Sequence, residues 1–196
     1  MSVVVAIKSG DKVYIGADSQ VTKGGSRVSL SNPNNYKIWK VKGAKNCIMG
    51  HVGAVRNACV IRVMDNIVRE IDVLKDNVDY EYVVNYVIPI IIDELKERSY
   101  IKDEVFSGMD SSFIFAYKSN LYIIGSDASV LEIDDYCAIG SGESEAIGSL
   151  STTSKDNNPK ERILKAIKAS ATHDIYVDYP IVITDTKSTE FDIIKE

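Results

Sequence analysis

Ser2 is the residue whose type and position could do chemistry most directly. An initiator methionine is usually trimmed when the next side chain is small, and trimming would leave Ser2 with both a hydroxyl and a free α-amine. An α-amine has a pKa of about 7.7–8.0, so near neutral pH it can accept the proton of its neighbouring hydroxyl. The apolar run Val3 to Ile7 follows at once, so we expect a sheet to hold this nucleophile in place.

The elements that would position Ser2 begin with two short strands. Val3 to Ile7 and Val13 to Ala17 are apolar runs on either side of the turn at residues 9–12, a pattern typical of a hairpin. A polar loop rich in Gly, Ser and Asn follows over residues 23–35. A second pair of strands is expected over 36–41 and 47–49, around a turn at 42–46, and Gly50 to Gly53 would end that pair.

Two long helices are expected next. Apolar residues recur at three- and four-residue steps from about residue 54 to 74, and again from about 80 to 99. Pro89 should bend or shorten the second helix, because proline has no N–H to donate. The density of Val and Ile around Pro89 also leaves a strand possible in the middle of that segment.

The second half of the chain continues with shorter elements. Strands are expected over 111–117, 121–125, 130–133 and 136–139, helices over 143–153 and 159–171, and closing strands over 175–177, 181–184 and 190–194. Blocks of strands and helix pairs of this kind favour two antiparallel sheets face to face, with a helix pair covering each. We therefore predict an α+β fold, a four-layer αββα sandwich, as a single domain over residues 1–196.

Composition restricts the classes of protein and of partner. The chain is 45% hydrophobic and 26% charged, as in an ordinary soluble globular protein. Its net charge of −5 argues against a nucleic-acid or anionic-membrane partner, and no apolar run is long enough to span a membrane. Cys47, Cys59 and Cys137 lie in apolar runs, which predicts reduced core thiols and a cytoplasmic location. Without a CxxC or His-rich cluster, we expect no metal site.

Taken in order, these features resemble the β-type subunits of the proteasome and their bacterial HslV-like relatives, a family of N-terminal-nucleophile hydrolases. In that family a Thr or Ser opens the first strand, an Asp is followed four residues later by Thr, and a Lys, a Gly, a Gly-Ser-Gly turn and a late Asp follow. The matching residues here are Ser2, Asp18, Thr22, Lys37, Gly53, Ser141 and Asp174.

The resemblance implies a role for each matching residue. Ser2 would attack a peptide carbonyl, and its α-amine would take the hydroxyl proton. Lys37 would lie beside that amine and disfavour its protonation, while Asp18 would pair with Lys37 and hold it.

The remaining roles concern the substrate and the amine. The Gly53 N–H would stabilise the oxyanion, and Ser141 and Asp174 would orient the α-amine. Val21 and Thr22 lie where the family binds an extended substrate strand and shapes its first specificity pocket.

The same resemblance implies a threonine- or serine-type endopeptidase that acts on peptides or unfolded proteins and needs no cofactor. It implies homo-oligomeric rings that enclose the sites, with contacts from apolar residues on the helices. An ATP-dependent unfoldase would have to be a separate chain, because no GxxxxGK[ST] phosphate loop occurs here.

Two departures from the family leave other functions open. The nucleophile is Ser where Thr is commoner, and Val3 stands where a second Thr often follows. If Met1 is retained, the Ser2 nitrogen is an amide and cannot act as a base. The alternatives are a catalytically inactive structural subunit and an amidase of the same fold acting on a small amide. His51 and His173 are expected to make local hydrogen bonds.

Overall fold

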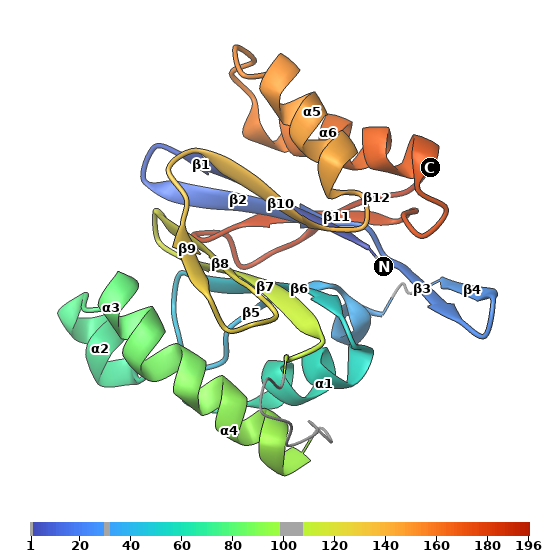
Figure 1. Ribbon diagram of the computed structural model, residues 1–196. Helices are drawn as coiled ribbons and strands as arrows, with labels where there is room; N and C mark the ends of the chain where they lie inside the picture. The colour runs from blue at the N-terminus through green and yellow to red at the C-terminus, as the bar shows by residue number, and fades with distance from the viewer. Residues whose placement is uncertain (1, 30–31, 99–107) are drawn as a thin grey trace.

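The computed structural model describes residues 2–29, 32–98 and 108–196, and it shows two stacked sheets between two layers of helices (Figure 1). One five-stranded sheet has the order β10-β1-β2-β11-β12, and the other has the order β5-β6-β7-β8-β9. Neighbouring strands are antiparallel in both sheets. Helices α5 and α6 cover the first sheet, and α1 to α4 cover the second (Figure 1). The predicted αββα sandwich is confirmed.

The first sheet carries the start of the chain. Strands β1 and β2 meet at the predicted hairpin turn, where Gly10 has a φ of +60°. The strands are β1 (Val3–Ser9), β2 (Lys12–Ala17), β10 (Tyr136–Gly140), β11 (Ile181–Asp185) and β12 (Asp192–Ile194). They agree with the predicted strands, except that no strand forms over 175–177, where the chain turns after α6.

The second sheet differs from the prediction at one end. It is built from β5 (Ile38–Lys40), β6 (Cys47–Gly53), β7 (Ser111–Tyr117), β8 (Asn120–Ile124) and β9 (Val130–Glu132). The strand does not stop at residue 49, because β6 continues through Gly50 and pairs with β7 as far as its last residue, Gly53. A side chain at Gly50 would meet Val4 and Ile15 of the facing sheet, so glycine there permits close approach of the two sheets.

The predicted polar loop contains a small hairpin. Strands β3 (Gln20–Lys23) and β4 (Ser26–Ser29) pair around Gly24-Gly25, both of which have positive φ. A two-residue Gly-Gly turn favours a hairpin even where the surrounding residues are polar. The hairpin projects from the sandwich beside the start of the chain (Figure 1). A short 3₁₀ helix, η1 (Pro33–Asn35), then leads into β5.

The predicted helix over 54–74 is two helices. α1 (Val55–Val63) and α2 (Glu70–Lys75) are separated by a non-helical segment in which Asn66 has a φ of +69°. Ile67 and Val68 within this segment are both buried. Adjacent residues of a helix face directions about 100° apart, so leaving the helix allows both side chains to enter the core.

The segment from Tyr80 to Arg98 is helical throughout, so the possible strand around Pro89 does not form. It consists of α3 (Tyr80–Tyr82), a π-helical turn η2 (Val83–Val87) and α4 (Ile88–Arg98). The Ile88 N–H donates to the Val83 carbonyl five residues back, which places the wider turn directly before Pro89. Proline cannot donate to the preceding turn, and a π-turn is a recognised adjustment at such a site. Ser99, the predicted end, lies outside the described residues.

The last two helices pack on the first sheet. α5 (Glu143–Thr152) and α6 (Pro159–His173) match the predicted helices, with α6 two residues longer. Asn158 caps α6 by accepting a hydrogen bond from the Glu161 N–H at 3.3 Å. A side chain at Gly16 would collide with Ile163, so a glycine in β2 lets α6 lie close against the sheet.

Strand β1 is buried on both faces, which explains its unbroken apolar sequence. Val4 and Ala6 lie in the core between the sheets, whereas Val3, Val5 and Ile7 pack toward α5 and α6. Burial on both faces fixes the register of β1 and therefore the position of Ser2 just before it.

Two of the three thiols agree with prediction. Cys47 and Cys137 are buried, but Cys59, on α1, is exposed. All three cysteines are free. Among the described helices, none is long and apolar enough to cross a membrane.

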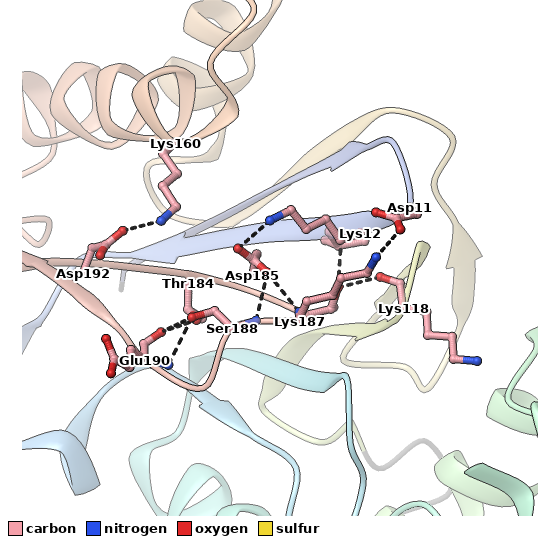
Figure 2. Close-up of polar contacts among 12 residues, drawn as sticks. Asp11, Lys12, Lys118, Lys160, Thr184, Asp185, Lys187, Ser188, Glu190 and Asp192 are labelled. Carbon is pink, nitrogen blue, oxygen red and sulfur yellow. Dashed lines mark hydrogen bonds and ion pairs between the residues drawn. The ribbon is translucent and has the colours of Figure 1, made fainter. Parts of the chain in front are cut away.

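The loop after β11 ties the two sheets together at the end of the sandwich with the β1–β2 turn (Figure 2). Asp185 accepts from Lys12 Nζ at 3.0 Å, and its carbonyl oxygen accepts from Lys40 Nζ at 2.6 Å. The Thr186 hydroxyl donates to the Lys118 carbonyl at 2.7 Å and accepts from the Val13 N–H at 3.2 Å. One buried side chain thus joins β2 to the β7–β8 turn.

We expect Thr186→Val to lower the free energy of unfolding by about 1–3 kcal/mol, because it leaves buried backbone groups without their partner. Thr189→Val is the matched control, since Thr189 is exposed in the same loop. Urea denaturation of the two variants measures the difference. Equal free energies of unfolding for Thr186→Val and Thr189→Val would show that the Thr186 hydrogen bonds make no net contribution to stability.

Candidate active site

The candidate site contains a buried ion pair between Asp18, which follows β2, and Lys37, which precedes β5. Lys37 Nζ lies 2.7 Å from each carboxylate oxygen of Asp18. The Asp18 side chain is 0% exposed and that of Lys37 is 8% exposed. Asp18 also accepts from the Val3 N–H at 2.9 Å and the Gln20 N–H at 3.0 Å. The carboxylate therefore joins the base of β1 to the lysine.

Burial shifts the proton affinity of both partners. Burial lowers the pKa of Lys37 because it penalises the charged ammonium, and the charges of Asp18 and Asp174 oppose that shift. Burial raises the pKa of Asp18, and Lys37 and the two backbone donors oppose it. Burying a charge is costly unless the charged group is paired and hydrogen-bonded. Lys37 and Asp18 provide that pairing for each other.

Ser2 lies against the turn formed by Gly140-Ser141-Gly142. Its backbone N–H donates to Ser141 Oγ at 3.0 Å, and its carbonyl oxygen accepts from the Gly142 N–H at 3.3 Å. Gly140 has a φ of +109°, and a side chain at this position would fall on the Ser2 carbonyl oxygen. The predicted turn therefore holds the backbone of Ser2, and glycine is required for its approach.

Gly53 ends β6 with a φ of +116°. The His51 N–H donates to the Lys37 carbonyl at 2.9 Å, and N–H groups alternate in direction along a strand. The Gly53 N–H therefore faces the same side of β6 as that of His51, toward Lys37. A side chain at Gly53 would collide with the Asp110 carbonyl, so glycine suits this position sterically.

A pocket of about 610 Å³ opens beside these residues. It is lined by five of the predicted site residues, which come from separate segments of the chain: Ser2, Val21, Thr22, Lys37 and Gly53. Asp18 lies behind Lys37, and Ser141 contacts Ser2 from the side.

Asp174 caps the C-terminal end of α6. Its Oδ1 accepts from the Tyr176 N–H at 2.8 Å, and its Oδ2 is buried without a hydrogen-bond partner among the described residues. The negative charge of Asp174 opposes the lowering of the Lys37 pKa by burial.

Gln20 is a site residue that sequence reasoning missed. Its Nε2 donates to the Ile175 carbonyl at 2.9 Å and to Thr22 Oγ1 at 3.2 Å, so it joins β3 to the turn after α6. Asp18, Gln20 and Thr22 are spaced by two, and this spacing predicts a shared face in an extended chain. The partner Ile175 has no comparable sequence signal.

His51 is a buried, neutral histidine in the pocket wall. Its Nε2 lies 3.0 Å from Ser111 Oγ, which also accepts from Asn57 Nδ2 at 3.0 Å. Because Asn57 already donates to that oxygen, the Ser111 hydroxyl proton is available for Nε2. Burial, followed by the positive charges of Arg62 and Lys37, lowers the pKa of His51 to about 3.

The low pKa of His51 predicts that the folded protein loses stability as the pH falls. The unfolded chain protonates His51 below its ordinary pKa of about 6.5, whereas the folded chain does so only near pH 3. Stability from this residue is therefore present above pH 6.5 and is lost as pH falls toward 3, by on the order of 5 kcal/mol in total. We expect His51→Gln to flatten the decline of unfolding free energy over this range. His173→Gln, at the exposed second histidine, is the control and should not change it.

Residues 2–179 match the family described as Proteasome subunit. The chain belongs to this family, and the resemblance to β-type, HslV-like N-terminal-nucleophile hydrolases is confirmed. Among curated proteins, it is 26% identical over 185 residues to the ATP-dependent protease subunit HslV of Caldicellulosiruptor saccharolyticus, covering 93% of this chain and 96% of that protein.

Solved structures share the fold at lower sequence identity. The Thiobacillus denitrificans BPH in complex with epoxomicin is 17% identical with a TM-score of 0.71, covering 93% of this chain and 97% of that one. The eukaryotic HslV from Trypanosoma brucei is 17% identical with a TM-score of 0.66, covering 93% and 98%. These similarities extend over nearly the whole sandwich.

Proposed function

We propose that this chain is a subunit of a self-compartmentalising protease that cleaves peptide bonds with Ser2 as an N-terminal nucleophile, after removal of Met1. The observation that supports this best is the proximity of Ser2 to a buried Lys37–Asp18 pair in the wall of one pocket. A buried lysine with a lowered pKa in a concave site is a common feature of catalytic machinery.

In the proposed reaction, Ser2 Oγ attacks the substrate carbonyl while the α-amine of Ser2 takes the hydroxyl proton. The tetrahedral intermediate places negative charge on the former carbonyl oxygen, which the Gly53 N–H stabilises. The C–N bond then breaks, and the leaving amine receives the proton that the α-amine had taken. Water hydrolyses the resulting ester by the same route and restores Ser2.

Lys37 would keep the α-amine in its basic form. Its positive charge disfavours a second positive charge close by, which lowers the fraction of protonated amine near neutral pH. Asp18 would hold the ammonium in position through two bonds of 2.7 Å. Ser141, which already accepts from the Ser2 nitrogen, would orient the amine, and Asp174 would assist from the end of α6.

An extended substrate would bind alongside Val21 and Thr22 of β3. Strand addition uses backbone hydrogen bonds for affinity, so it accepts many sequences, as degradation of unfolded proteins requires. The Caldicellulosiruptor relative is named as an ATP-dependent protease subunit. We propose that an ATP-dependent unfoldase on a separate chain supplies the substrate here also.

The proposed rings would use apolar residues exposed on α1 and α2. Val55, Val63, Ile71 and Leu74 are 55%, 62%, 50% and 75% exposed. Large apolar side chains exposed on helices, beyond those in the core, are a feature of subunit interfaces.

We expect light scattering at micromolar concentration to give the mass of a homo-oligomer of many subunits. Leu74→Glu should shift the distribution toward smaller species, because it places a charge in the contact. Lys75→Glu, at the exposed neighbouring residue, is the control for a charge change alone. A monomeric parent would contradict the assembly and favour a small-amide amidase.

The alternative is an inactive structural subunit. While Met1 remains, the Ser2 nitrogen is an amide that cannot act as a base. Intact mass and hydrolysis of a fluorogenic peptide, measured on the same preparation, separate the two functions. The protease requires a mass lacking Met1 together with turnover. A trimmed, assembled protein without turnover would establish the structural role.

A further inference from the structure

The pocket beside Ser2 contains an arginine that has no counter-ion within residues 2–29, 32–98 and 108–196. Arg62, on α1, lines the pocket together with Ser2 and Lys37. Its Nη2 donates to the Tyr36 carbonyl, and its guanidinium carbon lies 4.9 Å from the centre of the Trp39 ring. These contacts fix the charged group in place but do not neutralise it, because their partners are an uncharged carbonyl and an aromatic ring.

Two further cations among the described lining residues are paired. Lys37 binds Asp18, and Arg27 forms an ion pair with Asp178. Arg62 forms no ion pair with any residue in the described ranges, and its Nε is buried there without a hydrogen-bond partner. None of the described residues that line the pocket is an aspartate or a glutamate.

The positive charge in the pocket wall around Arg62 favours a ligand that carries a carboxylate. Leaving a partly buried guanidinium unpaired is costly, and a carboxylate compensates it with charge-assisted bonds that can be bidentate. A basic ligand group would instead meet the positive field of Arg62 and Lys37.

Resting on the function proposed above, we propose that Arg62 determines specificity by binding an Asp or Glu side chain of the substrate residue whose carbonyl Ser2 attacks. That carbonyl must approach Ser2 Oγ, so the side chain on the same residue enters the pocket that Ser2 lines. Arg62 touches the substrate side chain and not the reacting atoms, so its contribution is to selectivity among substrates.

The test compares peptides that differ only at this residue, carrying Glu, Gln, Leu or Lys, hydrolysed by the assembled, Met1-trimmed protein. Glu and Gln have nearly the same shape, so their ratio isolates the charge. We expect kcat/KM for Glu to exceed that for Gln by about 10- to 100-fold, with Lys the poorest substrate. Arg62→Met should remove the preference for Glu over Gln.

Arg56→Met is the matched control, because Arg56 is an exposed arginine of the same helix that donates to the Arg98 carbonyl outside the pocket. It should preserve the Glu preference. Arg62→Lys keeps the charge without the planar fork and should retain part of the preference. If Arg62→Met fails to assemble, the Glu-to-Gln ratios of the parent and of Arg62→Lys decide the matter.

Equal rates for Glu and Gln, or a Glu preference that survives Arg62→Met, would overturn the assignment of Arg62 while leaving the protease intact. If no peptide is hydrolysed, the proposed protease fails instead. Binding of acetylated peptide amides ending in Glu or Gln, measured by calorimetry, then tests Arg62 separately. Tighter binding of Glu that Arg62→Met abolishes would support the inference, and equal binding would overturn it.

Discussion

Lys37→Ala is expected to reduce peptide turnover by about 10²–10⁴-fold, the usual effect of losing a functioning general base. Without the ammonium, the α-amine of Ser2 would be protonated over more of the neutral pH range. The same change leaves the fully buried Asp18 without its cation, so we also expect a loss of about 3–5 kcal/mol in the free energy of unfolding. Fluorogenic peptide hydrolysis and urea denaturation measure the two effects.

Lys37→Arg separates the two contributions. Arginine keeps the positive charge but cannot reproduce the compact ammonium that lies 2.7 Å from both oxygens of Asp18. It should therefore restore stability better than it restores turnover. Lys45→Ala, at an exposed lysine of the turn before β6, should change neither quantity. Full activity of Lys37→Arg in trimmed protein would show that the role given to Lys37 is wrong.

The second large effect concerns Ser2. We expect Ser2→Ala to abolish turnover, by about 10⁶-fold if its loss resembles removal of the nucleophile from a serine protease. The bonds from Ser2 to Ser141 and Gly142 should persist, because they use its backbone N–H and carbonyl, which alanine retains. Ser2→Thr keeps both the hydroxyl and the α-amine and should remain active.

Ser154→Ala, at an exposed serine after α5, is the control for changes in activity that arise from preparing a variant protein. Retained activity in Ser2→Ala would eliminate the N-terminal-nucleophile mechanism for this chain. Loss of activity in Ser2→Ala together with dissociation of the oligomer would instead indicate a defect in assembly, so particle size must be measured on the same samples.

Much of the fold could be predicted because local patterns and burial agree. β1 is apolar at every position from Val3 to Ile7, and this pattern results from its burial between α5–α6 and the second sheet. Asn158 and Pro159 mark the start of α6 through capping and a fixed φ, both of which are sequence signals.

The errors arise where tertiary packing overrides local preference. The spacing of apolar residues indicates a continuous helix to residue 74, but burial of both Ile67 and Val68 interrupts it. The polar composition of residues 23–35 indicates a loop, but the Gly24-Gly25 turn forms a hairpin that places Val21 and Thr22 at the pocket.

Some residues of the candidate site could be predicted from the sequence, and others could not. Ser2, Asp18 and Lys37 could be found from their order and spacing, and they lie close together. Arg62 carries no such signal, because its significance depends on the lack of a carboxylate among the described residues that line the pocket with it. Charge compensation between distant segments depends on the fold, so sequence spacing alone cannot predict it.

The most direct test of Ser2 as an N-terminal nucleophile is to locate the adduct of a covalent inhibitor that reacts with Ser and Thr hydroxyls. Protein purified from its own source would be treated with the inhibitor, digested and analysed by mass spectrometry. We predict a mature N-terminal peptide that begins at Ser2 and carries the adduct on that residue. An N-terminal peptide that still contains Met1, or an adduct found only on another residue, would contradict the mechanism.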